Sequence, residues 1–356
     1  MMGNKIRWKA AAVLLTVLLL ISVIVVLNYA TQIKELKQKI AGYEDIGNGI
    51  RRHGQLQVRE GTLIDESGNP IQLQGISSHG LTWYPRHTNA GALNFWKEAG
   101  ANVFRASMYS DQERGYIYYP EESSNYLYIA VENALACDMY AIIDWHILYD
   151  SNPLDHMDEA KVFFEDAASH YRNEPGIIYE ICNEPNDDTT WDDITAYAKE
   201  IIPVIRKYAP ASVIVVGMPN YCTDYEPVLN TPLEFDNIMY AFHQYVDGKG
   251  APYDSYILEK MVENQMPVFV TEWGIGLGAQ EGKEVNFTAS DRFLDFLDKY
   301  NISWTVWSLS NMDNSHALIK AESREYGALS VEDLSEVGEY VYERLKASSP
   351  PIKTIY

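Results

Sequence analysis

Short apolar stretches alternate with amphipathic helical segments along most of this 356-residue chain. Eight of the stretches, rich in β-branched and aromatic residues, have the length and composition of buried strands. They occupy residues 71–78, 101–108, 140–145, 177–182, 212–218, 238–244, 267–272 and 302–308. Helical periodicity covers residues 122–138, 158–172, 190–208, 253–264, 288–299 and 331–347. Strands that alternate with helices pair in parallel, so eight such units predict an α/β fold, the (β/α)8 TIM barrel.

A doubly wound open sheet is the alternative arrangement of the same elements. Folds of that kind that bind dinucleotides carry a Gly-x-Gly-x-x-Gly turn after the first strand, and this sequence has none there. Ahead of the barrel, residues 56–75 have the pattern of a β-hairpin, with its turn at "SGNP", residues 67–70. We therefore expect the barrel domain at residues 53–348, followed by a short tail at 349–356.

An unbroken apolar run lies near the N-terminus. Residues 10–27 carry no charge. As a helix that rises about 1.5 Å per residue, they would span about 27 Å, close to the hydrocarbon thickness of a bilayer. Lys5, Arg7 and Lys9 precede the run, and the positive-inside rule keeps such an end in the cytoplasm. The sequence thus predicts an N-terminal transmembrane helix, with the barrel outside the cell.

This prediction divides the N-terminal segment into a cytoplasmic tail at 1–9, a signal anchor at 10–29 and a stalk or linker at 30–52. A cleaved signal peptide, which would release a secreted protein, is the alternative. Its apolar region normally has about 7–15 residues and ends at a small-x-small site. The run here is longer and "NYA", residues 28–30, does not fit such a site, so a single-pass membrane protein is favoured.

Charge and cysteine content exclude several kinds of partner. The net charge is −22, although residues 1–52 hold eight Lys/Arg against three Asp/Glu, so the acidic excess lies in the barrel domain. Such a body disfavours nucleic acid and favours a neutral or cationic ligand. Cys137, Cys182 and Cys222 have no CxxC or metal-ligand spacing. We interpret them as small packing residues.

Polar side chains follow seven of the eight predicted strands. Active sites of TIM barrels lie at the C-terminal ends of the strands. Reading those ends in order gives His79, Arg105, His146, Asn183 with Glu184, His243 with Tyr245, Glu272 and Trp307. The fifth strand, which ends in "VVGMPN", offers no ionisable group. The sequence therefore predicts a catalytic or binding site at this face of the barrel.

Two glutamates stand at strand ends that face each other across the barrel mouth. Glu184 follows strand four and Glu272 ends strand seven. A pair of carboxyls around a pocket is the equipment for cleaving a glycosidic bond, with retention at a separation of about 5–5.5 Å and inversion at about 6.5–9.5 Å. A zinc site built by His79, His146 and His243 is the alternative. These histidines lack His-x-His or His-Glu-x-x-His spacing, so we expect hydrogen-bonding histidines, no metal and no cofactor.

At this point the motifs resemble glycoside hydrolase family 5, most closely its bacterial endoglucanase branch, subfamily 2. The resemblance covers residues 56–348. It rests on seven segments in order: "GISSHGLTWYP", "FRASMY", "IIDWH", "YEICNEPN", "AFHQY", "VFVTEWG" and "ISWTVWSLS". It implies a retaining endo-β-1,4-glucanase that acts on a β-glucan, and a monomer. A cis peptide bond between Trp307 and Ser308 is expected as well.

The resemblance also implies a role for each matching residue. Glu184 would be the general acid/base and Glu272 the nucleophile. Arg105, Asn183, His243 and Tyr245 would support them, Asn183 by holding the sugar 2-hydroxyl. Substrate contacts would come from His79, Trp83, His146 and Trp307. The double role of Glu184 needs a pKa above that of Glu272, which we expect from Arg105 beside Glu272 and from a lone, partly desolvated Glu184.

One departure from the family lies just past the last strand. Relatives read "WNLSDK" there, whereas this chain reads "WSLSNMDNSHA", with Met312 and Asn314 where a lysine and a glutamate normally contact sugars. The preferred β-glycan is thereby left open. A β-mannanase, a xyloglucanase or a mixed-linkage glucanase is the nearest alternative. A cell-wall remodelling enzyme that transfers glycosyl units to another sugar instead of water, and a catalytically silent glycan-binding protein, are others.

Overall fold

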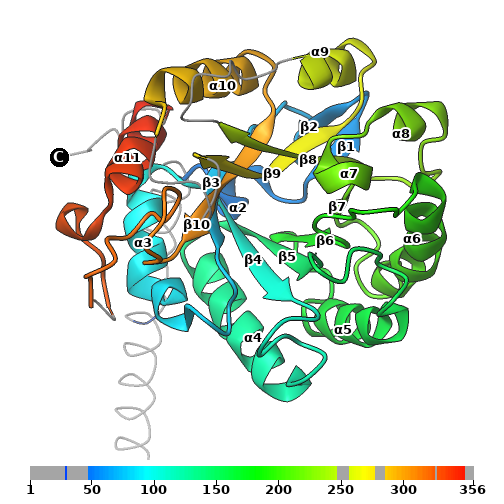
Figure 1. Ribbon diagram of the computed structural model, residues 1–356, viewed down its shortest axis with the longest axis horizontal. Helices are drawn as coiled ribbons and strands as arrows, with labels where there is room; N and C mark the ends of the chain where they lie inside the picture. The colour runs from blue at the N-terminus through cyan, green and yellow to red at the C-terminus, as the bar shows by residue number, and fades with distance from the viewer. Residues whose placement is uncertain (1–28, 30–46, 247–255, 277–284, 325–326, 349–356) are drawn as a thin grey trace, which may run out of the picture. The chain divides into compact units, whose positions relative to one another are not determined.

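The computed structural model describes residues 29, 47–246, 256–276, 285–324 and 327–348. Within them, eight parallel strands close a barrel in the order β10-β3-β4-β5-β6-β7-β8-β9 (Figure 1). The strands are β3 (Gln74–Ser78), β4 (Val103–Tyr109), β5 (Tyr140–His146), β6 (Ile177–Glu180), β7 (Ile214–Val216), β8 (Ile238–Val246), β9 (Val268–Ile275) and β10 (Ser303–Leu309). The predicted TIM barrel is confirmed, and each predicted strand overlaps one of these eight.

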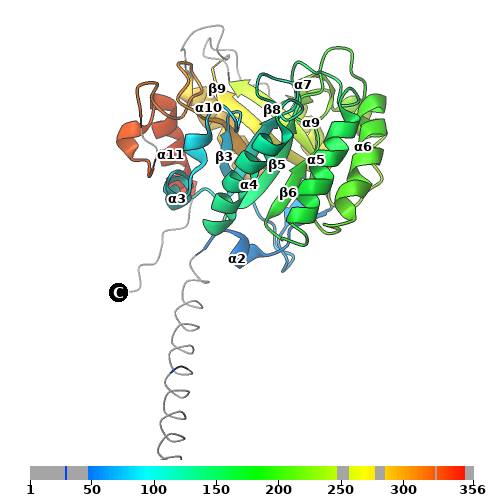
Figure 2. The same ribbon diagram turned by 90° about the horizontal axis from the view of Figure 1, so that it is seen from below.

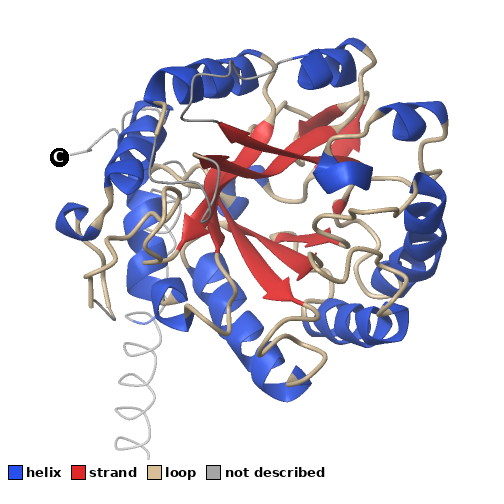
Figure 3. Cartoon of the chain, viewed as in Figure 1, coloured by secondary structure: helices blue, strands red, loops and turns tan. Residues whose placement is uncertain are grey.

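Helices surround the ring of strands (Figure 3). The long ones are α3 (Ala90–Ala99), α4 (Pro120–Ala136), α5 (Met157–His170), α6 (Trp191–Arg206), α9 (Tyr256–Glu263), α10 (Phe287–Lys299) and α11 (Glu336–Ser348). Short turns of helix are α2 (Ile50–His53), η1 (Pro85–Thr88), α7 (Pro219–Cys222), α8 (Glu226–Asn230) and η2 (Val331–Asp333). All six predicted helices are present, and α3 is additional.

Helix α3 has clear boundary signals that the periodicity analysis missed. The Asn89 side chain accepts hydrogen bonds from the backbone N–H groups of Gly91 and Ala92, and Gly100 ends the helix with a φ of 118°. An Asn N-cap and a left-handed Gly after the last turn are standard helix ends. The helix is only ten residues long, so its apolar stripe is too short to stand out.

Side chains along each strand point alternately outward to the helices and inward to the barrel. The inward-facing ones form a lower apolar layer and an upper polar layer. In β4, Phe104, Ala106 and Met108 face outward and belong to the core shared with the helices. Arg105 lies between them on the opposite, inward face, as strand geometry requires. Below it, Val103 packs with residues of the other strands and with Leu56 and Leu63 in a separate apolar cluster. The apolar layer therefore closes one end of the barrel and leaves the polar residues at the other.

The N-terminal hairpin seals that closed end, and its turn precedes the predicted "SGNP" turn, which is also present and pairs Ile64 with Pro70 antiparallel. Strands β1 (Gln57–Arg59) and β2 (Thr62–Ile64) pair antiparallel, and the connecting residues Glu60 and Gly61 have φ values of 50° and 75°. Two consecutive positive φ values define the tight turn that fits a twisted hairpin. The "SGNP" segment forms the second turn, in which Asp65 Oδ1 accepts from Asn69 N at 2.9 Å. Figure 2 shows the blue N-terminal elements at one end of the barrel and α7 at the other.

The predicted anchor at 10–29 lies outside the described residues except for Tyr29, as do the tail at 1–9 and the C-terminal tail at 349–356. Among the helices that are described, none is both long enough and apolar enough to cross a bilayer. The anchor and the extracellular placement of the barrel remain predictions from the sequence.

Shortening Leu63, which lies in the hairpin that covers the closed end of the barrel, should destabilise the protein. Leu63 is buried in the lower apolar cluster, so Leu63→Ala removes packing and leaves a cavity worth about 2–5 kcal/mol of unfolding free energy. Arg59, on the exposed side of the same hairpin, is the matched control, and Arg59→Ala should stay within about 0.5 kcal/mol of the parent. Urea denaturation measures both. Equal midpoints for the two variants would show that the hairpin does not seal the core.

Candidate active site

Arg105 lies at the centre of the polar layer, with no exposed surface. Its Nε and Nη2 donate to the Glu180 carboxylate at 2.6 and 3.2 Å, and its Nη1 donates to Glu272 Oε2 at 3.0 Å. Nη2 also donates to Asn183 Oδ1 at 2.7 Å and lies 3.0 Å from Asp144 Oδ2. One guanidinium thus joins three carboxylates and an amide that come from three separate stretches of the chain.

Two of those carboxylates, Asp144 and Glu180, were not singled out from the sequence. Both are fully buried and face the barrel interior. Burial raises the pKa of Glu180, but Arg105 and His243 outweigh it and bring the pKa down to about 2. Burial also raises the pKa of Asp144, and there Arg105 does not compensate, so the pKa stays well above its ordinary value. The like charges of Glu180 and Glu272 add to the effect of burial at Asp144.

The Glu272 carboxylate is fixed by both of its oxygens. Oε2 accepts from Arg105, and Oε1 accepts from the Tyr245 hydroxyl at 2.5 Å. Burial, followed by the charge of Glu272, raises the pKa of Tyr245 well above its usual range, so the phenol remains a donor. The two contacts aim the carboxylate and leave little rotational freedom.

Glu184 is not the lone acid that the sequence led us to expect. Its Oε1 lies 2.8 Å from His243 Nδ1. On the other side of the ring, His243 Nε2 lies 3.0 Å from Thr271 Oγ1, whose hydroxyl donates to Glu180 Oε1 at 2.7 Å. Burial lowers the pKa of His243, but the neighbouring carboxylates of Glu180 and Glu184 raise it to about 9. Burial likewise raises the pKa of Glu184, and the His243 partner outweighs this and lowers it.

The two candidate catalytic acids face each other at short range. One carboxylate oxygen of Glu184 and one of Glu272 lie within 4.8 Å of each other, and a His243 nitrogen lies within the same distance of both. These three atoms have the spacing of metal ligands. A metal-ligating imidazole must offer a lone pair, however, and His243 with a pKa of about 9 carries protons on both nitrogens at neutral pH. The arrangement favours acid/base chemistry over metal binding.

The alternative of a three-histidine zinc site is not supported in the part of the chain that the structure describes, where His79, His146 and His243 do not form a ligand cluster. His146 Nδ1 lies 2.7 Å from Asp144 Oδ2. His79 Nδ1 accepts from Gly80 N at 2.7 Å. Burial lowers the pKa of His79 to about 3 and that of His146 to about 4. Both rings are therefore neutral hydrogen-bonding groups, as expected.

A cavity of about 390 Å³ opens above the two acids. Its lining includes the predicted residues His79, Trp83, His146, Glu184, Tyr245, Glu272 and Trp307. Seven further lining residues were not predicted as contacts: Tyr109, Gln112, Leu148, Tyr149, Met312, Asn314 and His316. The other predicted residues, Arg105, Asn183 and His243, are buried and do not line the cavity. Arg105 and His243 reach the cavity through their partners Glu272 and Glu184, which do line it.

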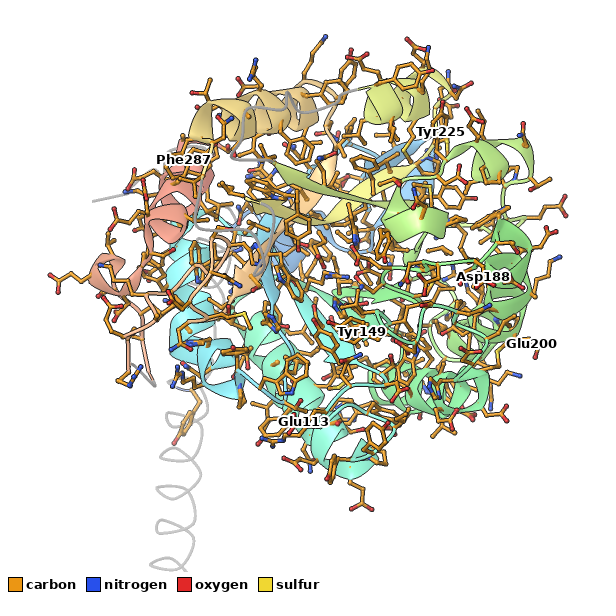
Figure 4. All side chains as sticks on the ribbon, in the orientation of Figure 1. Glu113, Tyr149, Asp188, Glu200, Tyr225 and Phe287 are labelled. Carbon is orange, nitrogen blue, oxygen red and sulfur yellow. The ribbon has the colours of Figure 1, made fainter. Side chains whose placement is uncertain are left out.

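Aromatic rings form much of the cavity wall. Trp307 stacks on His146 with ring centroids 5.2 Å apart and an interplanar angle of 7°, and Trp83 lies 4.6 Å from Tyr109. The Trp307–Ser308 peptide bond is cis, as predicted. Tyr149 is 80% exposed and stands over the open face of the ring of strands (Figure 4). Flat rings with polar edges are well suited to sugar rings.

Asn183 is held by hydrogen bonds within the protein. Its Nδ2 donates to Ile147 O at 2.9 Å and lies 3.4 Å from His146 Nε2. The contact with His146 is long, so the Nδ2 hydrogen that makes it is available to a better-placed acceptor.

The three cysteines make none of these side-chain contacts. Cys222 Sγ lies 2.9 Å from Asn183 O. Cys182 and Cys222 are buried and free, and Cys137 is partly buried and free, which agrees with a packing role.

Comparison with known proteins decides the family. The chain matches the family model described as Cellulase (glycosyl hydrolase family 5) over residues 64–313. It belongs to glycosyl hydrolase family 5. It is 36% identical over 302 residues to Endoglucanase A of Butyrivibrio fibrisolvens, a match that covers 83% of this chain and 70% of that protein. It is also 37% identical over 330 residues to the cellulase CelDZ1 of a Thermoanaerobacterium species, which covers 85% of each chain.

Solved structures of family 5 members agree with this assignment. The catalytic domain of endoglucanase Cel5A from Thermobifida fusca superimposes with a TM-score of 0.78 at 34% identity, covering 83% of this chain and 99% of that domain. A form of the same Thermobifida enzyme has been solved with cellotetraose (TM-score 0.77, 33% identity, 83% of this chain and 99% of that one covered). This family 5 protein is a glycosyl hydrolase.

The buried His243 should make stability depend on pH. Its pKa in the fold, about 9, lies above the ordinary value of 6.5, so its contribution is complete below pH 6.5 and is lost as the pH rises through 9. A shift of this size corresponds to about 3 kcal/mol. The free energy of unfolding in urea should therefore fall between pH 6.5 and 9.5. The fall should be smaller in His243→Asn than in the parent.

The control for that experiment is His170→Asn, at a partly exposed histidine on the outer helices, which should keep the parent's pH dependence. Parallel losses of stability in the parent and in His243→Asn would show that His243 gains no proton affinity on folding.

Proposed function

We propose that this family 5 hydrolase is a retaining endo-β-1,4-glucanase that cleaves internal bonds of β-glucans by double displacement. The observation that carries the proposal is the short separation of Glu184 and Glu272, whose nearest carboxylate oxygens lie within 4.8 Å. Retaining glycosidases place their two carboxyls about 5–5.5 Å apart, whereas inverting enzymes leave a wider gap for water. The spacing supports direct attack by one carboxylate.

Glu272 has the environment of a nucleophile. Arg105 and Tyr245 bind one oxygen each, and a cation beside a carboxylate favours its ionised form. In the first step Glu272 attacks the anomeric carbon, the bond to the leaving oxygen breaks, and a glycosyl ester forms. Preorganised donors around the carboxylate lower the cost of orienting it at the moment of reaction.

Glu184, with His243, has the environment of a proton donor and acceptor. The pair titrates as a unit because the two groups share a 2.8 Å contact. Against the effect of burial, His243 lowers the pKa of Glu184, so the proton of the pair reaches the leaving oxygen from His243 through Glu184, a transfer that the charge of Glu272 favours while Glu272 is ionised. Once the ester forms, that charge is gone, the proton affinity of Glu184 falls, and the carboxylate takes a proton from the attacking water. The change of role therefore follows from the charge on Glu272.

Sugar binding is assigned to the rings and amides around the acids. Trp307 would form the floor of the cleavage subsite, with His146 beside it at a stacking distance of 5.2 Å. His79 and Trp83, whose rings lie 5.6 Å apart, would contact the next sugar. The Asn183 Nδ2 hydrogen that makes the long contact with His146 would serve the 2-hydroxyl. These roles extend the family resemblance, and the cavity lining supports four of them.

The choice of β-glucan over other β-glycans rests on the relatives, which are named endoglucanases and cellulases. A β-mannanase, a xyloglucanase, a mixed-linkage glucanase or a transglycosylase would use the same two acids. A silent glycan-binding protein is disfavoured because Glu184, Glu272, Arg105 and Asn183 are all present, and Arg105 binds both Glu272 and Asn183.

A substrate panel tests the proposed function. The purified protein should hydrolyse carboxymethylcellulose and lichenan faster than xyloglucan, glucomannan or xylan. Proton NMR of early product from cellopentaose should show the β-anomer first, because two displacements retain configuration. Early α-anomer would overturn the role of Glu272 as nucleophile, and silence on all five polysaccharides would favour the binding protein.

Chemical rescue distinguishes the two acids. Glu272→Gly should lower kcat by more than about 10⁴-fold, the scale on which loss of a covalent nucleophile acts, and azide should restore turnover as an α-glycosyl azide. Glu184→Ala should lose about 10²–10⁴-fold on unactivated substrates and give a β-glycosyl azide. Replacement of the distant lining residue Gln112 by Ala is the control and should need no rescue. The same azide anomer from both variants would contradict the assignment.

A further inference from the structure

The loop after β10 places a histidine at the wall of the catalytic cavity that no role above uses. His316 is 6% exposed and lines the cavity together with Glu184, Glu272 and Trp307. Its Nδ1 is shielded from solvent and has no hydrogen-bond partner, and among the described residues no hydrogen bond reaches either ring nitrogen. An unpartnered buried polar atom is unusual in a folded protein. The other ring nitrogen, Nε2, is not among the shielded atoms, and it is the nitrogen that a ligand in the cavity can reach.

The loop backbone fixes the position of this imidazole. Ser308 N donates to His316 O at 2.9 Å, which ties the residue to the end of β10 beside Trp307. Asn314 Oδ1 accepts from the backbone N–H groups of His316 and Ala317 at 3.2 and 2.9 Å. Asn314 Nδ2 lies 3.0 Å from Met312 Sδ. Asn314 therefore uses its amide to shape the loop, and the ring that the loop presents to the cavity is His316.

The ring also adjoins the residue that orients the nucleophile. His316 meets Tyr245 edge to face, with centroids 5.5 Å apart and an interplanar angle of 64°, and Tyr245 donates to Glu272. A group that touches Tyr245 and shares a cavity with Trp307 lies beside the sugar ring that these two residues would enclose.

We propose that His316 is a specificity-determining residue, which hydrogen-bonds one hydroxyl group of the glycone sugars bound in the cavity. The inference rests on the proposed function and deepens it. Burial lowers the pKa of His316 to about 4, against the opposing pull of Glu272, so the ring is neutral over the working range and offers one donor and one acceptor. A sugar hydroxyl can pair with either kind of ring nitrogen, because a hydroxyl both donates and accepts hydrogen bonds.

The test pairs variants of the ring with substrates that lack single hydroxyls. The substrates are 2,4-dinitrophenyl β-cellobioside and its monodeoxy analogues, and the main variant is His316→Phe, which keeps a planar ring without polar atoms. For the parent protein, one analogue should lose about three- to tenfold in kcat/KM, the range of a single neutral hydrogen bond. In His316→Phe the same analogue should react as fast as the unmodified cellobioside. The KM of this variant for the unmodified cellobioside should be higher than that of the parent protein.

A matched control is available in the same chain. His87 is also buried, has an unpartnered Nδ1 and a pKa lowered by burial to about 4, but it does not line the cavity. For each monodeoxy analogue, His87→Phe should show the same loss of kcat/KM as the parent protein. If His316→Phe does not fold, His316→Gln serves instead and should retain part of the hydrogen bond. The proposal would be overturned if the His316 variants kept the KM of the parent protein and lost as much kcat/KM with each monodeoxy analogue as the parent protein does.

Failure of the proposed function would look different. If the parent protein cleaves no β-glucan, calorimetric titration with cellotetraose replaces kinetics. His316→Phe should then bind about three- to tenfold more weakly than the parent and than His87→Phe. Equal binding by all three proteins, or no binding by the parent, would overturn the inference about His316.

Discussion

Arg105 is a single cation sealed in the barrel among Asp144, Glu180 and Glu272, and the geometry of the site depends on it. A buried charge is tolerated only when partners surround it closely, so each of these carboxylates must be held where the guanidinium meets it. The third of them, Glu272, is thereby aimed at the cavity. Removal of Arg105 would leave buried acids unpaired and would free the nucleophile at the same time.

A continuous series of contacts joins the two acids below the cavity. It runs from Glu184 to His243, through Thr271 to Glu180, and through Arg105 to Glu272. The proton affinity of Glu184 is therefore coupled to the charge of Glu272 by fixed groups as well as through the cavity. The apolar layer beneath, closed by the hairpin, keeps water away from this series and strengthens each contact in it.

Much of the fold and of the site could be predicted from the sequence. The eight strands were found because each buried run is short and bounded by polar segments, and Glu184 and Glu272 were found because each follows such a run. Asp144 and Glu180 were missed because an inward position within a strand has no local signal when its neighbours are apolar. Nor could the sequence show that His243 would pair with Glu184, since these residues are 59 positions apart and come together only when the barrel closes. His316 was passed over for a related reason: its burial depends on how the loop after β10 folds back.

The identity of the nucleophile is the central claim, and trapping the glycosyl ester tests it directly. A 2-fluoro substituent slows both displacements, while an activated leaving group lets the first proceed. After incubation with 2,4-dinitrophenyl 2-deoxy-2-fluoro-β-cellobioside, protease digestion and tandem mass spectrometry should find the fluorocellobiosyl group on Glu272, with one equivalent of phenol released. A label on Glu184, or phenol release with no labelled peptide, would contradict the account.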